Sequence, residues 1–337
     1  MKKILYLGNK LETKGRSAST IDTLGPLLEV EGYKVRYASE KLNIVLRFCS
    51  MINAVLRYAK KSDFILIDTY STLNFYYAFF CSQICRILKV KYIPLLHGGD
   101  LPLRLKKSPK LSSMIFNHSY RNIAPSEFLK YKFEQSGFTN IQIIPNSIVL
   151  ENFPFLEREQ MSPKLLWVRA LAEIYNPIMA LEVLQKIQQA HPNASLTMVG
   201  PDKENMLANL QDFALSAKLN VNFYGKLSRS EWGEISKSHS IFLNTSSFDN
   251  LPVSLLEAAS LGLVIVSTNA GGIPHIFEDQ TNSLLSPIND SATMSANITN
   301  LLQDEVLQNK LVANAHLLSA KFDWSLIKEQ WRDVLNS

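Results

Sequence analysis

Cysteine is scarce in this sequence, and no apolar run is long enough to cross a membrane. The 337 residues include three cysteines, Cys49, Cys81 and Cys85, and none has the spacing of a zinc site. We interpret all three as reduced core residues, which favours a reducing compartment. The longest apolar stretch, residues 75–88, is shorter than the about 20 residues that a spanning helix needs. The run Ile4–Leu7 is too short for a signal-peptide core, so we expect a cytoplasmic location.

Motifs for metals and nucleic acids are also lacking. The sequence has no Asp-x-Asp pair and no histidine cluster at ligand spacing, so we expect neither a metal nor a cofactor. It has no zinc finger, no RNP sequence and no arginine-rich tract, so we expect no nucleic-acid partner. It has no internal repeat and no low-complexity segment. The composition, with 46% hydrophobic and 19% charged residues, is that of an ordinary globular protein.

Charge is divided unevenly between the two halves of the chain. Residues 1–150 hold 22 Lys and Arg against 10 Asp and Glu, and residues 151–337 hold 13 against 20, which gives +12 and −7. The first half could face an anionic partner such as the inner face of a membrane, or it could be an unevenly charged solvated surface. Within it, Lys41–Lys61 mixes apolar and basic residues. This segment fits a helix lying on anionic lipid, and it also fits a core-facing helix with solvated charges.

Short apolar runs alternate with longer helical patterns along the whole chain, which predicts an α/β fold. Continuous apolar strands are typical of parallel sheets buried on both faces. The alternation occurs twice, before and after a Pro- and Asn-containing segment at 146–155. We therefore predict two doubly wound, Rossmann-like parallel-sheet domains, 1–150 and 151–321, facing each other across a cleft. A terminal helix at 322–337 with a bulky apolar face is predicted to pack on a core, with the first domain as one candidate.

The most informative stretch is Asn244–Pro274. A strand is predicted to end near Leu243, and a helix is predicted over 251–261. Pro252 suits the first turn of this helix, and Asp249 or Asn250 suits its cap. A helix N-terminus presents unpaired backbone N–H groups and a positive partial charge, which suit a diphosphate.

Two further features of this stretch point to a ligand. The Ala270–Gly271–Gly272 turn allows close approach of the backbone to a bound molecule. Asp249 and Glu257 stand eight residues apart, and carboxylates accept hydrogen bonds from paired hydroxyls such as those of a sugar or a ribose. The spacing alone fits a capped helix with a surface glutamate equally well.

The run DNLPVSLLE, followed by AASLGLVIVSTNAGGIP, resembles the signature of the retaining glycosyltransferases of family 4 (group 1), which have the GT-B fold. In that family two acidic residues flank seven others, and a small-residue helix, a strand and Gly-Gly follow. Here Asp249 stands where Glu is commoner, in the Asp-Asn-x-Pro form of a subgroup. Other segments resemble the family in order, among them His97–Gly98–Gly99, Ile144–Ile148 and Phe223–Lys226.

The resemblance implies a set of site residues. It implies catalytic roles for three of them, His97, Asp249 and Arg169. It implies that the donor is bound by Glu257, Asn250, Leu251, Pro252, Lys226, Gly15, Gly271 and Gly272. The sequence departs from the family in one important place. The lysine expected about five residues after Arg169 is absent, because that region reads Ile174–Tyr175–Asn176–Pro177.

The function implied is retaining, metal-independent transfer of a sugar to a glycan or lipid-linked acceptor. The donor implied is a UDP- or GDP-sugar. No enzyme nucleophile is evident in the sequence, which favours front-face attack assisted by the leaving group. Two alternatives stay open. One is an isomerase on the same fold, such as a nucleotide-sugar 2-epimerase. The other is a catalytically silent nucleotide-sugar-binding homologue, which the missing lysine would favour.

Overall fold

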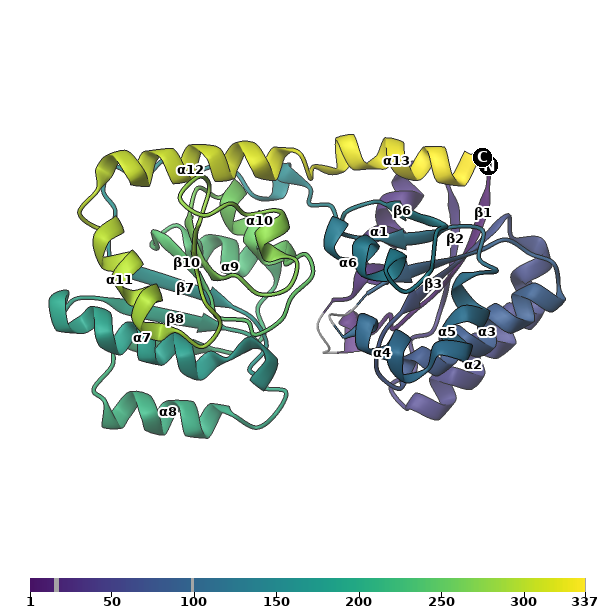
Figure 1. Ribbon diagram of the computed structural model, residues 1–337, viewed down its shortest axis with the longest axis horizontal. Helices are drawn as coiled ribbons and strands as arrows, with labels where there is room; N and C mark the ends of the chain where they lie inside the picture. Colours follow the sequence, from purple (N-terminus) through teal and green to yellow (C-terminus); the bar gives the residue numbers. More distant parts are fainter. Residues whose placement is uncertain (15–17, 98–99, 337) are drawn as a thin grey trace. The chain divides into compact units, whose positions relative to one another are not determined.

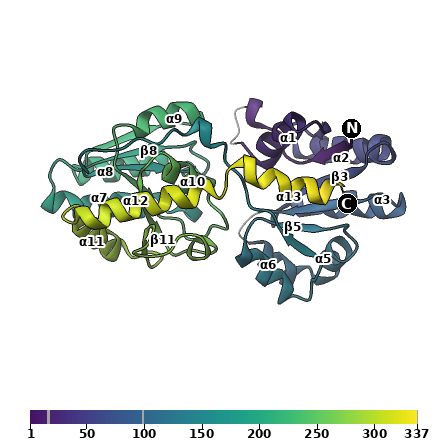
Figure 2. The same cartoon turned by 90° about the horizontal axis from the view of Figure 1, so that it is seen from above.

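The computed structural model describes residues 1–14, 18–97 and 100–336. The chain divides into two compact units, and each is described by itself (Figure 1, Figure 2). Unit 1 consists of Met1–Pro145 together with Lys328–Ser337, and unit 2 consists of Asn146–Ile327. The sequence-based boundaries lay at residues 150 and 321, so each falls within six residues of a division in the structure.

Unit 1 is built on a six-stranded parallel sheet in the order β2-β1-β3-β4-β5-β6. Its strands are β1 Lys3–Leu7, β2 Lys34–Ala38, β3 Phe64–Thr69, β4 Tyr92–Leu96, β5 Asn122–Ala124 and β6 Ile141–Ile143. Every residue of β3 and β4 is buried, as the continuous apolar runs predict. Side chains at the carboxyl ends of these central strands therefore lie over the middle of the sheet edge.

Helices connect the strands of unit 1, because parallel pairing needs a crossover between successive strands. They are α1 Thr20–Val30, α2 Ile44–Tyr58, α3 Asn74–Ile87, α4 Leu101–Lys107, α5 Pro109–Phe116 and α6 Glu127–Glu134. α2 and α3 pack side by side, and the Phe48 and Phe80 rings meet edge to face at 5.6 Å. Cys81 and Cys85 lie in the core between α3 and the sheet, and burial raises the pKa of the Cys85 thiol to about 12.

The last helix, α13 Trp324–Asn336, closes unit 1 with its second half. Glu31 at the end of α1 pairs with Lys328 at 3.2 Å and with Arg332 at 2.6 Å. Lys2 donates a 2.6 Å hydrogen bond from Nζ to the Leu335 carbonyl, so the two ends of the chain lie together in this unit (Figure 1). The final turns of the chain are thus part of the first unit's structure.

Unit 2 has a second six-stranded parallel sheet in the order β12-β11-β10-β7-β8-β9. Its strands are β7 Lys164–Val168, β8 Ser195–Val199, β9 Val221–Tyr224, β10 Ile241–Asn244, β11 Val264–Thr268 and β12 Leu284–Ser286. Side chains of β7 alternate between faces: Leu165 and Trp167 enter one apolar cluster, and Leu166 enters the other. The short edge strand β12 was not predicted from the sequence.

The helices of unit 2 cover both faces of this sheet. They are α7 Pro177–Ala190, α8 Leu207–Ser216, α9 Arg229–Ser236, α10 Val253–Ser260, α11 Ser291–Leu301 and α12 Glu305–Ala320. Arg158, in the connection before β7, donates hydrogen bonds to the carbonyls of Ser236, Leu261 and Gly262, where α9 and α10 end. A cation at a helix C-terminus opposes the negative end of the helix dipole, so Arg158 fixes the ends of both helices.

Two parallel α/β sheets confirm the predicted fold class. None of the helices within the described ranges combines the length and apolar composition that a membrane crossing needs.

Candidate nucleotide-sugar site

The carboxyl edge of the unit 2 sheet brings together most of the residues that the sequence singled out. Arg169 directly follows β7, the loop 245–252 follows β10, and the turn 269–272 follows β11. β7, β10 and β11 are neighbours in the sheet, so these three connections meet at one edge. In open parallel sheets this edge is where ligands bind.

Arg169 and Asp249 form an ion pair at this edge. The Arg169 Nη2 atom lies 2.8 Å from Asp249 Oδ2, and the other carboxylate oxygen accepts the Asn250 backbone N–H at 2.8 Å. The Tyr175 ring lies 5.3 Å from the Arg169 guanidinium carbon, and Asn244 accepts a 3.4 Å hydrogen bond from Arg169 Nε. Burial raises the pKa of Asp249, and Arg169 opposes that rise. The guanidinium is therefore held at the sheet edge by contacts on several sides.

Glu257 lies on α10 and is almost completely buried, with 4% of its surface exposed. Its Oε1 atom lies 2.8 Å from Nε of Arg229, which opens α9. Burial raises the pKa of Glu257, and the positive charges of Arg229 and Arg169 oppose the rise. The two carboxylates of the acidic pair are thus each matched by an arginine from a different connection.

The start of α10 differs from the prediction. The helix begins at Val253 with Pro252 as its N-cap, and no side chain among the described residues caps it. Asp249 or Asn250 was expected as the cap, but the Asp249 carboxylate pairs with Arg169 and with the Asn250 N–H, and Asn250 Oδ1 has no partner among the described residues. Two buried polar atoms beside this helix start, Asn250 Oδ1 and Ser254 Oγ, have no hydrogen-bond partner within the described ranges. Buried polar groups are normally paired, so these two atoms have capacity for a further hydrogen bond beside the helix start.

Gly271 and Gly272 pack against the loop before α10. A Cβ atom on Gly271 would lie 2.1 Å from the Asp249 carbonyl oxygen, and one on Gly272 would lie 2.1 Å from that of Asn250. Gly272 also donates its N–H to the Asp249 carbonyl at 2.7 Å. The glycines were expected to allow approach to a ligand; here they allow approach of the two loops to each other. They therefore hold Asp249 in place.

The remaining predicted donor residues lie in different surroundings. Leu251 packs in the apolar cluster beneath the sheet edge with 4% of its surface exposed, so its side chain serves the core. Lys226 is exposed in the connection between β9 and α9. Gly15 lies outside the described residues. The structure thus gathers Arg169, Asp249–Pro252, Glu257 and Gly271–Gly272 in one place.

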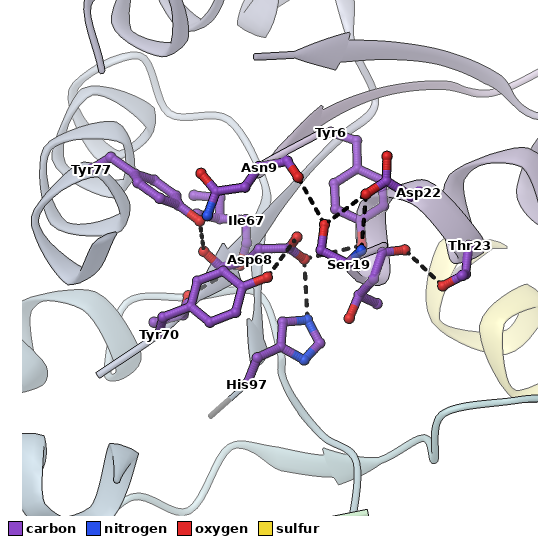
Figure 3. A network of polar contacts seen from close by, with 12 residues as sticks. Tyr6, Asn9, Ser19, Asp22, Thr23, Ile67, Asp68, Tyr70, Tyr77 and His97 are labelled. Atoms are coloured by element: carbon purple, nitrogen blue, oxygen red, sulfur yellow. Dashed lines mark hydrogen bonds and ion pairs between the residues drawn. The ribbon is translucent and has the colours of Figure 1, made fainter. Parts of the chain in front are cut away.

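His97 belongs to unit 1, where it follows β4 and contacts a buried acid. Its Nε2 atom lies 3.1 Å from Asp68 Oδ1, and Tyr6 donates its hydroxyl to the same oxygen at 3.1 Å (Figure 3). The Tyr70 hydroxyl reaches the other oxygen at 3.5 Å. Asp68 is fully buried at the end of β3.

The contact with Asp68 determines which nitrogen of the His97 ring donates a hydrogen bond. Burial raises the pKa of Tyr6 and Tyr70 well above the usual value, so both hydroxyls keep the protons that they donate. A carboxylate only accepts hydrogen bonds, so His97 donates its Nε2–H to Asp68. Nδ1 is then the ring nitrogen left for other partners.

Two partners of predicted site residues were not predicted from the sequence: Asp68, which contacts His97 in unit 1, and Arg229, which contacts Glu257 in unit 2. Asp68 interrupts an otherwise apolar strand near its carboxyl end, which is a usable signal for a site residue. Arg229 follows Ser228, which forms a capping box with Glu231, so its place in a first helical turn was readable. Its contact with Glu257 was not readable, because 27 residues separate the two in the chain. No group of three metal-binding side chains gathers in the described parts of either unit.

Two six-stranded parallel sheets, with an arginine and a helix start without a side-chain cap at the edge of the second, match the architecture of the GT-B glycosyltransferases. Residues 150–317 match the family model of the glycosyl transferases group 1. The chain belongs to that family, as the resemblance predicted.

Comparisons with known proteins agree with this assignment. The chain is 23% identical over 202 residues to the phosphatidylinositol N-acetylglucosaminyltransferase gpi3 subunit of Schizosaccharomyces pombe. The alignment covers 58% of this chain and 43% of that protein. The chain spans less than half the length of the first curated relatives that it matches.

Among solved structures, sucrose-phosphate synthase from Thermosynechococcus elongatus aligns with a TM-score of 0.80 at 14% identity, over 100% of this chain and 98% of that one. Anabaena HepE in complex with UDP-glucose aligns with a TM-score of 0.77 at 17% identity, over the whole of both chains. These likenesses confirm the fold.

Proposed function

We propose that this protein is a retaining glycosyltransferase that moves a sugar from a UDP- or GDP-sugar to a glycan or lipid-linked acceptor without a metal. One observation carries the proposal: buried, unpartnered polar atoms of Asn250 and Ser254 lie beside the uncapped start of α10, next to the Arg169–Asp249 pair. Backbone N–H groups at a helix start and an arginine together suit a diphosphate.

In the proposed complex, each of these side chains of unit 2 contacts a different part of the donor. Arg169 and the first N–H groups of α10 bind the diphosphate, Glu257 accepts the ribose hydroxyls, and Asp249 accepts hydroxyls of the sugar. During transfer the bond from the anomeric carbon to the phosphate oxygen breaks, and the acceptor oxygen bonds to that carbon on the same face. The acceptor proton passes to the departing phosphate oxygen. Negative charge grows on the diphosphate in the transition state, so fixed positive groups there lower the barrier.

The acceptor side of the proposal rests on unit 1. His97, with its ring nitrogen oriented by Asp68, is proposed to contact the transferred sugar. The fission-yeast relative is named for a lipid acceptor, and the Anabaena structure contains UDP-glucose. The first supports an acceptor that can be membrane-bound, and the second supports a nucleotide-sugar donor.

A membrane contact is proposed for the start of α2. Ile44, Val45 and Leu46 are 46%, 63% and 59% exposed, whereas Met51 and Val55 further along the helix are buried in the core. The helix therefore has a core-facing part, and its first turn adds an apolar surface to a strongly basic unit. Val45→Glu should reduce cosedimentation with phosphatidylglycerol vesicles and leave nucleotide binding unchanged. Equal cosedimentation of both proteins would reject this contact.

The donor proposal is tested by binding and turnover. UDP-glucose, UDP-N-acetylglucosamine and GDP-mannose are screened for a rise in melting temperature, because a ligand that binds only the folded state stabilises it. The stabilising donor is then followed with and without an acceptor panel. We expect transfer in the original protein, and loss of transfer in Glu257→Gln and Arg169→Lys. Lys237→Ala is the control, because this exposed residue pairs only with Glu234 at the surface of α9.

Other outcomes identify the alternatives. Conversion of the donor to an isomer without acceptor would indicate an epimerase. Binding without transfer across the panel would indicate a silent binder. Full transfer by both site variants would overturn the site assignment.

A further inference from the structure

Charges of opposite sign alternate along the carboxyl edge of unit 2. Arg229 contacts Glu257 at 2.8 Å, and Arg169 contacts Asp249 at 2.8 Å. The positive charge of Arg169 also acts on Glu257. The site without donor is therefore balanced: two carboxylates face two guanidiniums.

Donor binding disturbs this balance. A nucleoside diphosphate brings at least two negative charges close to Asp249 and Glu257. Arg169 is already bound to Asp249, and residues 170–185 contain no Lys or Arg. With Arg169 as the only arginine, two carboxylates and a diphosphate would repel one another in a poorly solvated place. The charge of Arg229 reduces this repulsion.

Arg229 and Glu257 differ in their freedom to move. The Glu257 side chain is 5% exposed and is fixed on α10, whereas the Arg229 side chain is 49% exposed at the first position of α9. Glu257 Oε1 accepts no hydrogen bond from the described residues, although Arg229 Nε lies 2.8 Å away, so a ribose hydroxyl that bonds to this oxygen must occupy space now taken by the guanidinium. The arginine can turn away through solvent, and the glutamate cannot.

We propose that Arg229 is a displaceable second cation of the donor site. It neutralises Glu257 while the site is empty, and it leaves Glu257 for the donor's diphosphate when a ribose binds. This inference rests on the proposed function and adds to it a residue that governs recognition of the diphosphate. In this scheme Arg229 contacts the diphosphate, so its contribution is measured first as affinity for the diphosphate.

The test compares ligands with and without phosphate. Binding of UDP, GDP, uridine and guanosine is measured by calorimetry for the original protein, Arg229→Ala, Arg229→Lys and the control Lys237→Ala. Lys237 lies at the other end of α9 and carries the same charge. Arg229→Ala should weaken binding of the diphosphate on the order of 10- to 100-fold, the range for one charge-assisted hydrogen bond. Binding of the matching nucleoside should be unchanged or stronger, because Glu257 is released. Arg229→Lys should recover part of the loss.

The outcomes separate the inference from the function beneath it. If neither UDP nor GDP binds the original protein, the proposed function fails and the inference falls with it. If the original protein binds a diphosphate and Arg229→Ala binds it equally well, only the role of Arg229 is overturned. If nucleoside and diphosphate lose affinity by the same factor, Arg229 merely holds Glu257 in place, and the displacement is refuted.

Discussion

Replacing Arg169 by methionine would leave the Asp249 carboxylate buried without its partner. Breaking a buried ion pair from one side costs about 3–5 kcal/mol. The two side chains keep 15% and 17% exposure, so we expect the lower end of that range, about 3 kcal/mol in the free energy of unfolding at neutral pH. The loss arises from an uncompensated charge, and it should therefore depend on pH.

The direction of this dependence follows from the pKa of Asp249. Burial raises it, and Arg169 opposes the rise, so the variant should have a still higher folded-state pKa. Between the unfolded and folded pKa values the folded protein holds the extra proton, so its stability falls as pH rises through that interval. The difference in free energy of unfolding between Arg169→Met and the unmodified protein should thus be small near about pH 4, close to the ordinary carboxyl pKa. It should reach its full size at neutral pH.

The assay is urea unfolding at both pH values, followed by tryptophan fluorescence. Trp167 is fully buried in unit 2, and its indole N–H donates to Thr245 in the loop before Asp249, so it reports on this region. A second change, Asp249→Asn in the Arg169→Met background, should restore much of the stability because no buried charge remains. An equal loss at both pH values, or no recovery in the double variant, would refute the reasoning.

The other predictions concern unit 1 and the glycine turn. Asp68→Asn should lower kcat and leave the Kd for nucleotide unchanged, because it changes the partner of the His97 ring and the acceptor of two tyrosine hydroxyls in unit 1, and touches no donor-site residue of unit 2. Inverted nitrogen assignments for the His97 ring in 15N NMR spectra would confirm the cause, and an unaltered ring would contradict it. Gly271→Ala should destabilise the protein by at least about 1 kcal/mol and weaken donor binding, since its φ is +58° and the new Cβ would meet the Asp249 carbonyl. The matched change Gly233→Ala, in α9 with open space around it, should stabilise the protein by about 0.5–1 kcal/mol. Thermal unfolding of the two variants measures both effects, and equal melting temperatures would contradict the packing argument.

Much of the fold was predictable because buried parallel strands leave a strong sequence signal. The apolar run Tyr92–Leu96 lies between Lys91 and His97, and the run Asn122–Ala124 ends at Pro125, so a polar residue or a proline marks the end of each strand. The strand Leu284–Ser286 was missed because three residues at a sheet edge carry almost no pattern.

The site was less predictable, because its contacts join distant segments. The acidic pair and Arg169 were found from local motifs and from the family resemblance. The predicted cap of α10, Asp249 or Asn250, is wrong, because the helix begins at Val253 and Asp249 pairs with an arginine 80 residues earlier. That arginine brings a full positive charge to the carboxylate, and nothing near Asp249 in the sequence signals it. The partners of Glu257 and His97 likewise come from other connections and leave no signal near either residue.

The division of the chain has a practical consequence for exchanging parts between relatives. Unit 1 is discontinuous, because its last piece, Lys328–Ser337, comes after the whole of unit 2. A hybrid that takes only residues 1–145 from a homologue would combine a foreign Glu31 with a native Lys328 and Arg332, and would break that three-way ion cluster if the homologue differs. Swaps of unit 1 between relatives should therefore move the terminal ten residues along with the first 145, or insert a foreign 146–327 between them.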